Sequence, residues 1–173
     1  MLQLILGGAR SGKSRLAEKL AADSALNVIY IATSQPLDGE MNQRVASHRA
    51  RRPERWGLVE EPVELARVLR ENAAPDRCLL VDCLTLWLTN LLMLDDPERL
   101  FQERESLLES LTGLPGEIIF VSNETGLGIV PLGELTRRYV DEAGLLHQAL
   151  AGRCQRVVLT VAGLPLTLKG TPL

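Results

Sequence analysis

Apolar residues follow two alternating patterns along this chain. Continuous apolar runs of strand length occupy residues 2–6, 27–32, 78–82, 117–122 and 156–161. Runs of this kind are typical of strands that are buried on both faces of a parallel sheet. Between them, apolar residues recur every three or four positions, as in helices that cover a sheet, over residues 13–22, 84–94, 97–111 and 132–151. The alternation predicts the α/β class, with a mostly parallel sheet and helices on both faces.

Prolines mark the expected ends of further elements. A helix over residues 40–51 should stop before Pro53, because the residue that precedes a proline is disfavoured in the helical region. Residues 58–60 form a candidate short strand, and Pro62 suits the first turn of the helix that follows.

The second half of the chain carries similar signals. Asp96 followed by Pro97 marks the cap and the first turn of the helix over 97–111. Two glycines and a proline preclude a helix over 123–131, and the short apolar tail at 164–168 would add an edge strand.

Composition limits the possible functions. The chain has 173 residues, of which 46% are hydrophobic and 24% charged, so it can bury a sizeable core and is expected to form one domain over residues 1–173. Its net charge of −3 and its 3% of aromatic residues argue against a general nucleic-acid binder, because such proteins are usually basic and stack bases on aromatic rings.

The cysteines and the apolar segments bear on location. Cys78, Cys83 and Cys154 lack metal-type spacing and are interpreted as buried free thiols. No basic stretch precedes the first apolar run, so no secretory signal is visible and a cytoplasmic location is expected. The most apolar stretch, 78–94, is too short and too polar for a membrane span.

Residues 7–14 read GGARSGKS and match the phosphate-binding pattern G-x-x-x-x-G-K-[ST] between a predicted strand and a predicted helix. A chance glycine-rich turn is the alternative, but the pattern and its structural context agree. Lys13 would reach the β- and γ-phosphates of ATP or GTP, and the Ser14 hydroxyl would ligate Mg²⁺. The expected nucleotide contacts are Gly7, Gly8, Ala9, Arg10, Ser11, Gly12, Lys13 and Ser14.

Polar residues also follow other predicted strands. Asp82 closes the run LLVD and is the candidate second ligand for Mg²⁺, although an aspartate there could simply cap the next helix. Thr33 and Ser34 follow one strand and Asn123 and Glu124 another, at the edge where open α/β sheets bind ligands. For each of these four, hydrogen bonding within a local turn explains the residue equally well.

The segment 41–56 concentrates positive charge around a histidine. It contains five arginines and one glutamate, and His48 would share a helix face with several of these arginines. Neighbouring cations would lower the pKa of His48 and keep its ring neutral and nucleophilic. From composition alone, a solvated basic face with a bystander histidine is the simpler interpretation. His147, which lies among leucines, is interpreted as structural.

Several segments together resemble one enzyme family: GGARSGKS, YIATSQ (30–35), EMNQRVASHRARRP (40–53), VDCLTLWLTNLL (81–92), VSNETGLGIVP (121–131) and the tail GLPLTLKG (163–170). The chain resembles, over nearly its whole length, the bifunctional adenosylcobinamide kinase / adenosylcobinamide-phosphate guanylyltransferase family of cobalamin biosynthesis. The H-R-x-R-R-P segment and the NETGLGIVP loop carry this resemblance, because the phosphate loop alone occurs in many families.

The resemblance implies a P-loop NTPase-type (RecA-like) fold, a trimer and two reactions. ATP or GTP would phosphorylate the aminopropanol hydroxyl of adenosylcobinamide, and GMP from GTP would then pass through His48 to that phosphate. It also implies that further residues lie near the nucleotide: Ala32, Thr33, Ser34, Arg49, Ala50, Arg51, Arg52, Glu60 or Glu61, and Asp82.

Two other functions compete with this interpretation. A monofunctional P-loop kinase could use the basic helix only as a phosphate clamp, and a RecA-like ATP-binding module could act through partner or nucleic-acid contacts. The guanine-reading motif N-K-x-D is absent from the sequence, and the group that would accept the proton of the acceptor hydroxyl is not identified by any local pattern.

Overall fold

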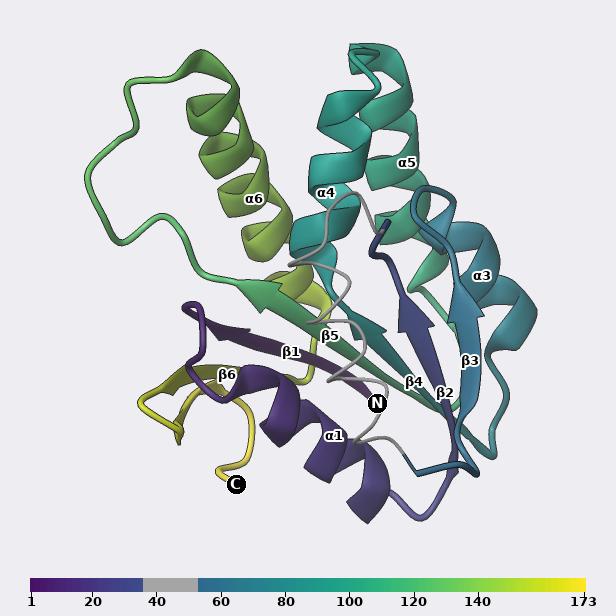
Figure 1. Ribbon diagram of the computed structural model, residues 1–173. Helices are drawn as coiled ribbons and strands as arrows, with labels where there is room; N and C mark the ends of the chain where they lie inside the picture. Colours follow the sequence, from purple (N-terminus) through teal and green to yellow (C-terminus); the bar gives the residue numbers. More distant parts are fainter. Residues whose placement is uncertain (36–52) are drawn as a thin grey trace.

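One sheet of seven strands organises the computed structural model, which describes residues 1–35 and 53–173 (Figure 1). The strand order is β3-β2-β4-β5-β1-β6-β7. Six strands run parallel, and β7 pairs antiparallel with β6 at one edge. The strands are β1 (Leu2–Gly7), β2 (Asn27–Ala32), β3 (Gly57–Glu60), β4 (Arg77–Asp82), β5 (Glu117–Asn123), β6 (Arg156–Val161) and β7 (Leu164–Lys169).

Helices cover both faces of this sheet (Figure 1). Helix α1 (Lys13–Asp23) lies on one face, and the other face carries α3 (Leu65–Asn72), α4 (Leu84–Met93), α5 (Pro97–Ser110) and α6 (Glu134–Arg153). This arrangement confirms the predicted α/β class and the mostly parallel sheet.

Alternate residues of the central strands enter two separate cores. On β4, Leu79 and Val81 pack with α3 to α6, whereas Cys78 and Leu80 pack on the side of α1. All four are at most 1% exposed. Because both faces are covered, consecutive positions of the strand must be apolar, which explains the continuous runs in the sequence. Burial of each such leucine or valine contributes about 1.5–3 kcal/mol to stability.

The predicted elements within the described ranges are present, with small differences at their ends. Asp96 caps α5, since its carboxylate accepts the N–H of Arg99 at 3.0 Å, and the tail forms the edge strand β7 as predicted. Helix α6 begins two residues later than expected, at Glu134. The predicted helix over 40–51 lies outside the described residues.

The expectation for Pro62 was wrong. Helix α3 begins only at Leu65, because the Oε1 atom of Glu61 accepts the N–H groups of Val63 and Glu64, each at 2.9 Å. These bonds build a turn where a first helical turn was expected.

The three cysteines are free thiols; Cys78 and Cys154 are buried as expected, whereas Cys83, just past the end of β4, is only half-buried. Burial raises the pKa of Cys78 and Cys83 to about 11 and that of Cys154 to about 12. Within the described ranges, no helix is both long enough and apolar enough to cross a membrane.

Candidate active site

The phosphate loop joins β1 to α1 at the carboxyl edge of the sheet. Its backbone closes a turn from Gly8 to Ser11, with an N–H···O distance of 3.2 Å, and the carbonyl of Ser11 accepts the N–H of Gly163 at 2.8 Å. No acidic residue lies in the first turn of α1, so the positive end of the helix dipole faces this loop without a competing carboxylate.

Two glycines of the loop are required by its geometry. Gly12 has a φ of +97°, a conformation that residues with a side chain rarely adopt. A Cβ at Gly7 would lie 2.4 Å from Oγ of Ser11 and 2.7 Å from the carbonyl oxygen of Thr160. The structure therefore explains the glycines at both ends of the motif.

Lys13 and Ser14 begin α1. The Lys13 ammonium donates to the carbonyl of Gly8 at 3.3 Å, so the side chain folds back over the loop. This position suits a lysine that neutralises a phosphate held by the loop.

Asp82 ends β4, two strands away from β1. Its Oδ2 atom accepts the hydroxyl hydrogen of Tyr30 at 2.8 Å, and Tyr30 itself is only 2% exposed. Asp82 does not cap α4, since the residue at the cap position is Cys83 and no side-chain cap bond is present there. The capping alternative for Asp82 is thus removed.

The donor set suits Mg²⁺. Ser14 and Asp82 offer a hydroxyl and a carboxylate oxygen, and within the described ranges no group of three or more His, Cys, Asp or Glu could hold a metal alone. Mg²⁺ is usually held by one or two protein oxygens together with substrate phosphates. These residues fit a Mg²⁺ ion that binds with the nucleotide.

Thr33 connects the ends of β2 and β4. Its hydroxyl donates to the carbonyl of Cys83 at 2.7 Å and accepts the N–H of the same residue at 3.0 Å, and Thr33 is completely buried. The carbonyl of Thr33 accepts from the side chain of Asn90 at 2.8 Å. The structure gives Thr33 a positioning role, while its predicted contact with nucleotide stays a prediction.

The other residues expected near the nucleotide also lie at this edge. Ala32 ends β2 and Ser34 follows it half-buried, whereas Glu60 ends β3. Glu61 is engaged in the turn before α3 and in an ion pair with Arg67 at 2.7 Å. A contact from Glu60 or Glu61 to the nucleotide stays a prediction.

Most of the basic segment, including its histidine, lies outside the described residues. The predicted nucleophile and the residues beside it fall outside the described residues: His48, Arg49, Ala50, Arg51 and Arg52.

Sequence reasoning missed one set of contacts. His147 of α6, interpreted from the sequence as structural, is buried; its Nε2 lies 2.8 Å from Oγ of Ser122, and its Nδ1 lies 4.0 Å from Oε2 of Glu124. His147 lies more than twenty positions along the chain from both Ser122 and Glu124, so no local pattern links it to them. The only available signal was that Glu124 follows a strand at the ligand edge.

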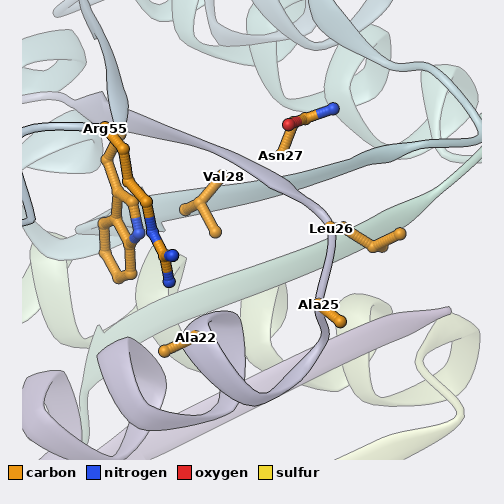
Figure 2. A pocket seen from close by; sticks show the side chains of 7 residues that line it. Ala22, Ala25, Leu26, Asn27, Val28 and Arg55 are labelled. Carbon is orange, nitrogen blue, oxygen red and sulfur yellow. The ribbon is translucent and has the colours of Figure 1, made fainter.

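Two pockets differ in their position. One of about 450 Å³ lies at the amino ends of β2 and β3, and Figure 2 shows Asn27, Val28 and Arg55 around it. No predicted site residue lines it. The other, of about 400 Å³, lies over the phosphate loop and is lined by Gly8, Ala9, Arg10, Ser11, Glu124, Leu127, Leu159, Thr160, Val161 and Ala162.

Comparison with solved structures supports the fold. The chain is similar to the RadB recombinase, with a TM-score of 0.54 and 20% identity over 91% of this chain and 73% of that chain. It is also similar to the flagellar accessory protein FlaH of Methanocaldococcus jannaschii, with a TM-score of 0.53 and 15% identity over 98% and 78% of the two chains. At such low identity these likenesses concern the fold alone.

The sheet order and the phosphate loop together define the fold class, which is a P-loop NTPase-type, RecA-like fold. The particular family follows from a family model that matches residues 3–168. The chain belongs to the cobinamide kinase / cobinamide phosphate guanyltransferase family, and it is a bifunctional enzyme with a kinase and a guanylyltransferase activity.

Two similar proteins agree with this assignment. The chain is 71% identical, over the full length of both chains, to the bifunctional adenosylcobalamin biosynthesis protein CobP of Pseudomonas aeruginosa. It is 40% identical to the bifunctional adenosylcobalamin biosynthesis protein CobU of Escherichia coli, over 98% of this chain and all of that protein.

Proposed function

We propose that residues 1–173 form one domain that carries out two successive reactions on a corrinoid. ATP or GTP first phosphorylates the aminopropanol hydroxyl of adenosylcobinamide, and GMP from GTP is then added to give adenosylcobinamide-GDP. The phosphate loop, with Lys13 folded over it at the edge that also holds Asp82, is the observation that carries the proposal. Membership of the cobinamide kinase / cobinamide phosphate guanyltransferase family supports the choice of substrate.

The kinase reaction requires in-line positioning and neutralised charge. The backbone N–H groups of residues 7–12 would cradle the phosphates, and Lys13 would neutralise the β- and γ-phosphates. Ser14 and Asp82 would hold Mg²⁺, which when bound stabilises the charge that develops during transfer.

Guanylyl transfer is proposed to run through a covalent intermediate. The ring nitrogen of His48 attacks the α-phosphorus of GTP, a P–N bond forms, and pyrophosphate leaves. An oxygen of the cobinamide phosphate then attacks the same phosphorus and releases the histidine. The side chains of Arg49, Arg51 and Arg52 would neutralise the phosphates in both steps. The arginine-rich sequence around His48 and the family assignment support this proposal.

Further contacts to the nucleotide are proposed from Ala32, Ser34 and Glu60 at the ends of β2 and β3, and from the backbone of Ala50. Glu61 and Thr33 would act less directly, because both are engaged in bonds that fix the neighbouring backbone.

A trimer is proposed on the basis of the family resemblance, and exposed apolar residues support association. Leu164, Leu166 and Leu168 on the edge strand β7 are 56–72% exposed. The loop between β5 and α6 arches away from the sheet in Figure 1 and exposes Leu127, Ile129, Val130 and Leu132. Light scattering that gave the mass of a single chain would contradict the trimer. No nucleic-acid partner is proposed, and the free thiols suit a reducing cytoplasm.

Intact-mass measurement after incubation with GTP and Mg²⁺ tests the function directly. The wild-type chain should gain the mass of one GMP, and addition of adenosylcobinamide phosphate should remove it. A monofunctional kinase would never gain this mass, even though it could still phosphorylate adenosylcobinamide.

A further inference from the structure

Glu124 is held directly against the phosphate loop. Its backbone N–H donates to the carbonyl of Gly7 at 3.1 Å, and the preceding residue, Asn123, pairs with Gly7 in the register between β5 and β1. The residue also lines the pocket of about 400 Å³ over residues 8–11 of the loop. A carboxylate therefore borders the space next to the predicted site of the γ-phosphate.

Polar groups around this pocket are poised for a ligand. Oγ of Ser11 and Oγ1 of Thr160, two residues that line it, are buried and have no hydrogen-bond partner in the part of the chain that the structure describes. The same holds for Oδ1 of Asn123 beside Glu124. Buried polar groups are rarely left unpaired, so each of these atoms can take a further hydrogen bond from an ordered water or from a bound polar ligand.

The two oxygens of Glu124 have different surroundings. Oε1 accepts the N–H of Gly126 at 2.6 Å, which fixes the orientation of the carboxylate. Oε2 faces Nδ1 of His147 at 4.0 Å, and no hydrogen bond to it is found among the described residues. The side chain of Glu124 is 22% exposed. One oxygen thus anchors the carboxylate and the other can accept a proton from a ligand.

His147 is fixed behind this carboxylate. Its side chain is 10% exposed, and Nε2 lies 2.8 Å from the hydroxyl oxygen of Ser122. Burial lowers the pKa of His147, and the Glu124 carboxylate raises it in part. When Nε2 of the neutral ring accepts a hydrogen bond from the Ser122 hydroxyl, the ring hydrogen is on Nδ1, and this N–H points toward Glu124.

A serine, a histidine and a glutamate in sequence could suggest a hydrolytic triad. Ser122 is only 1% exposed and lies inside β5, so its hydroxyl cannot meet a substrate. Of the three residues Ser122, His147 and Glu124, only Glu124 borders the pocket, so any contact of this group with a substrate is made by Glu124.

The other carboxylates at this edge of the sheet either form hydrogen bonds and ion pairs within the protein or lie further from β1 and the phosphate loop. Asp82 accepts from Tyr30, and Glu61 accepts two backbone N–H groups and pairs with Arg67. Glu60 ends β3, the strand at the far edge of the sheet from β6 and β7, whereas Glu124 follows β5, the direct neighbour of β1.

We propose that Glu124 is the catalytic base of the kinase reaction and that His147, held by Ser122, positions it. In this step the acceptor hydroxyl gives its proton to Oε2 of Glu124 while its oxygen bonds to the γ-phosphorus. The bond from that phosphorus to the β,γ-bridging oxygen breaks, and the nucleoside diphosphate leaves with the electron pair. Glu124 afterwards loses the proton to water. This inference rests on the proposed function, since it assigns a role within the first of its two reactions.

The two activities provide an internal control. Formation of the GMP adduct uses a neutral ring nitrogen as nucleophile and needs no base, whereas the hydroxyl of the kinase substrate is assisted by one. Glu124→Gln keeps the shape and the acceptor for Gly126 but removes the basic oxygen. We expect it to lower kcat of the kinase reaction by about 10²- to 10⁴-fold, and to change the rate of GMP-adduct formation by less than about threefold.

Glu134→Gln is the matched control, because Glu134 is an exposed glutamate in the first turn of α6. It should leave both rates unchanged. If Glu124→Gln lowers both activities together, Glu124 serves nucleotide or metal binding and the proposal is overturned. An unchanged kinase rate would overturn it equally.

A pair of substitutions at His147 tests the positioning role. The side-chain amide of asparagine can occupy the position of Nδ1, so His147→Asn keeps a hydrogen-bond donor that faces Glu124. The longer glutamine side chain places its amide at the position of Nε2, so His147→Gln keeps only the hydrogen bond with Ser122. We expect His147→Asn to retain kinase kcat within about threefold and His147→Gln to lose about tenfold, with adduct formation unchanged in both. Equal losses in the two variants, or losses shared by adduct formation, would show that His147 only supports the fold.

Failure of this inference is distinguishable from failure of the proposed function. A wild-type protein without any GMP adduct or any kinase activity would contradict the proposed function. A wild-type protein with both activities, in which Glu124→Gln behaves like Glu134→Gln, would contradict only the assignment of the base.

Discussion

The hydroxyl of Tyr30 donates a hydrogen bond of 2.8 Å to Oδ2 of Asp82 and so joins the end of β4 to its neighbour β2. Tyr30 packs in the core on the side of α1, with 2% of its surface exposed, and its ring is therefore fixed. A buried donor that holds one oxygen of a carboxylate restricts its rotation and fixes where the other oxygen lies. We infer that Tyr30 orients the predicted metal ligand.

Substitutions at this pair should separate charge from orientation. Asp82→Asn keeps the shape but removes the charge that would hold Mg²⁺, so kinase turnover should fall by at least tenfold while the circular dichroism spectrum is unchanged. Tyr30→Phe keeps the charge and should raise the Mg²⁺ concentration for half-maximal rate with a smaller loss at saturation. A Mg²⁺ titration that is identical in wild type and Asp82→Asn would assign Asp82 a structural role.

Lys13→Ala should remove both activities. The kinase and the guanylyltransferase reactions are both proposed to place a triphosphate in the loop over residues 7–14, and loss of the ammonium leaves that charge uncompensated. The Lys13 ammonium is exposed and donates a single long hydrogen bond, to the carbonyl of Gly8 at 3.3 Å, so the fold should survive the change. Near-normal GMP-adduct formation in a folded Lys13→Ala protein would show that the two reactions use separate nucleotide sites.

Thr33→Val should destabilise the protein by about 1–3 kcal/mol, because the N–H and the carbonyl of Cys83 would lose their shared partner inside the fold. The side chains are nearly equal in volume, so the loss reports the hydroxyl. Thr33→Ser, which keeps the hydroxyl, is the control. Urea unfolding monitored by tryptophan fluorescence measures both variants, and equal midpoints for Thr33→Val and wild type would contradict this account.

The strands and the phosphate loop could be predicted from sequence because their signals are local. Burial on both faces makes β4 apolar at consecutive positions, and the loop needs glycine at positions such as Gly12, whose φ is positive. The start of α3 was missed because it depends on side-chain bonds from Glu61 to the next turn, which compete with the preference of Pro62 for a first helical turn.

The surroundings of Glu124 could not be predicted in the same way. Its contacts with Gly7 and His147 depend on β5 pairing with β1 and on α6 packing behind both, and neither is specified by spacing along the chain. The leucines around His147 in the sequence led only to its interpretation as a structural residue. Sequence alone could not show that His147 packs against Glu124, or that the Glu124 carboxylate borders the pocket over the phosphate loop.

The cysteines should be unreactive in the folded protein at pH 8. Burial raises the pKa of each thiol, to about 11 for Cys78 and Cys83 and about 12 for Cys154, and the reactive species is the thiolate. At pH 8, three units below a pKa of 11, about one thiol in a thousand is ionised, and the fraction rises as pH increases. Titration with a thiol-specific chromogenic reagent should detect no fast-reacting group in buffer and three in denaturant. Rapid labelling of the native protein would contradict the raised pKa values.

His48→Ala should separate the two activities. If His48 is the covalent nucleophile, its removal abolishes GMP attachment and guanylyl transfer, whereas phosphorylation of adenosylcobinamide continues because γ-phosphoryl transfer requires no imidazole. The wild-type adduct should be labile in acid and stable in base, as expected for a phosphorus–nitrogen bond, and a serine ester would not show this behaviour. Arg55→Ala is a suitable control, because it removes a cation of the same segment that is not among the predicted nucleotide contacts. A His48→Ala protein that still carries one GMP after treatment with GTP would disprove the assignment, and peptide mapping of the adduct would then identify the true nucleophile.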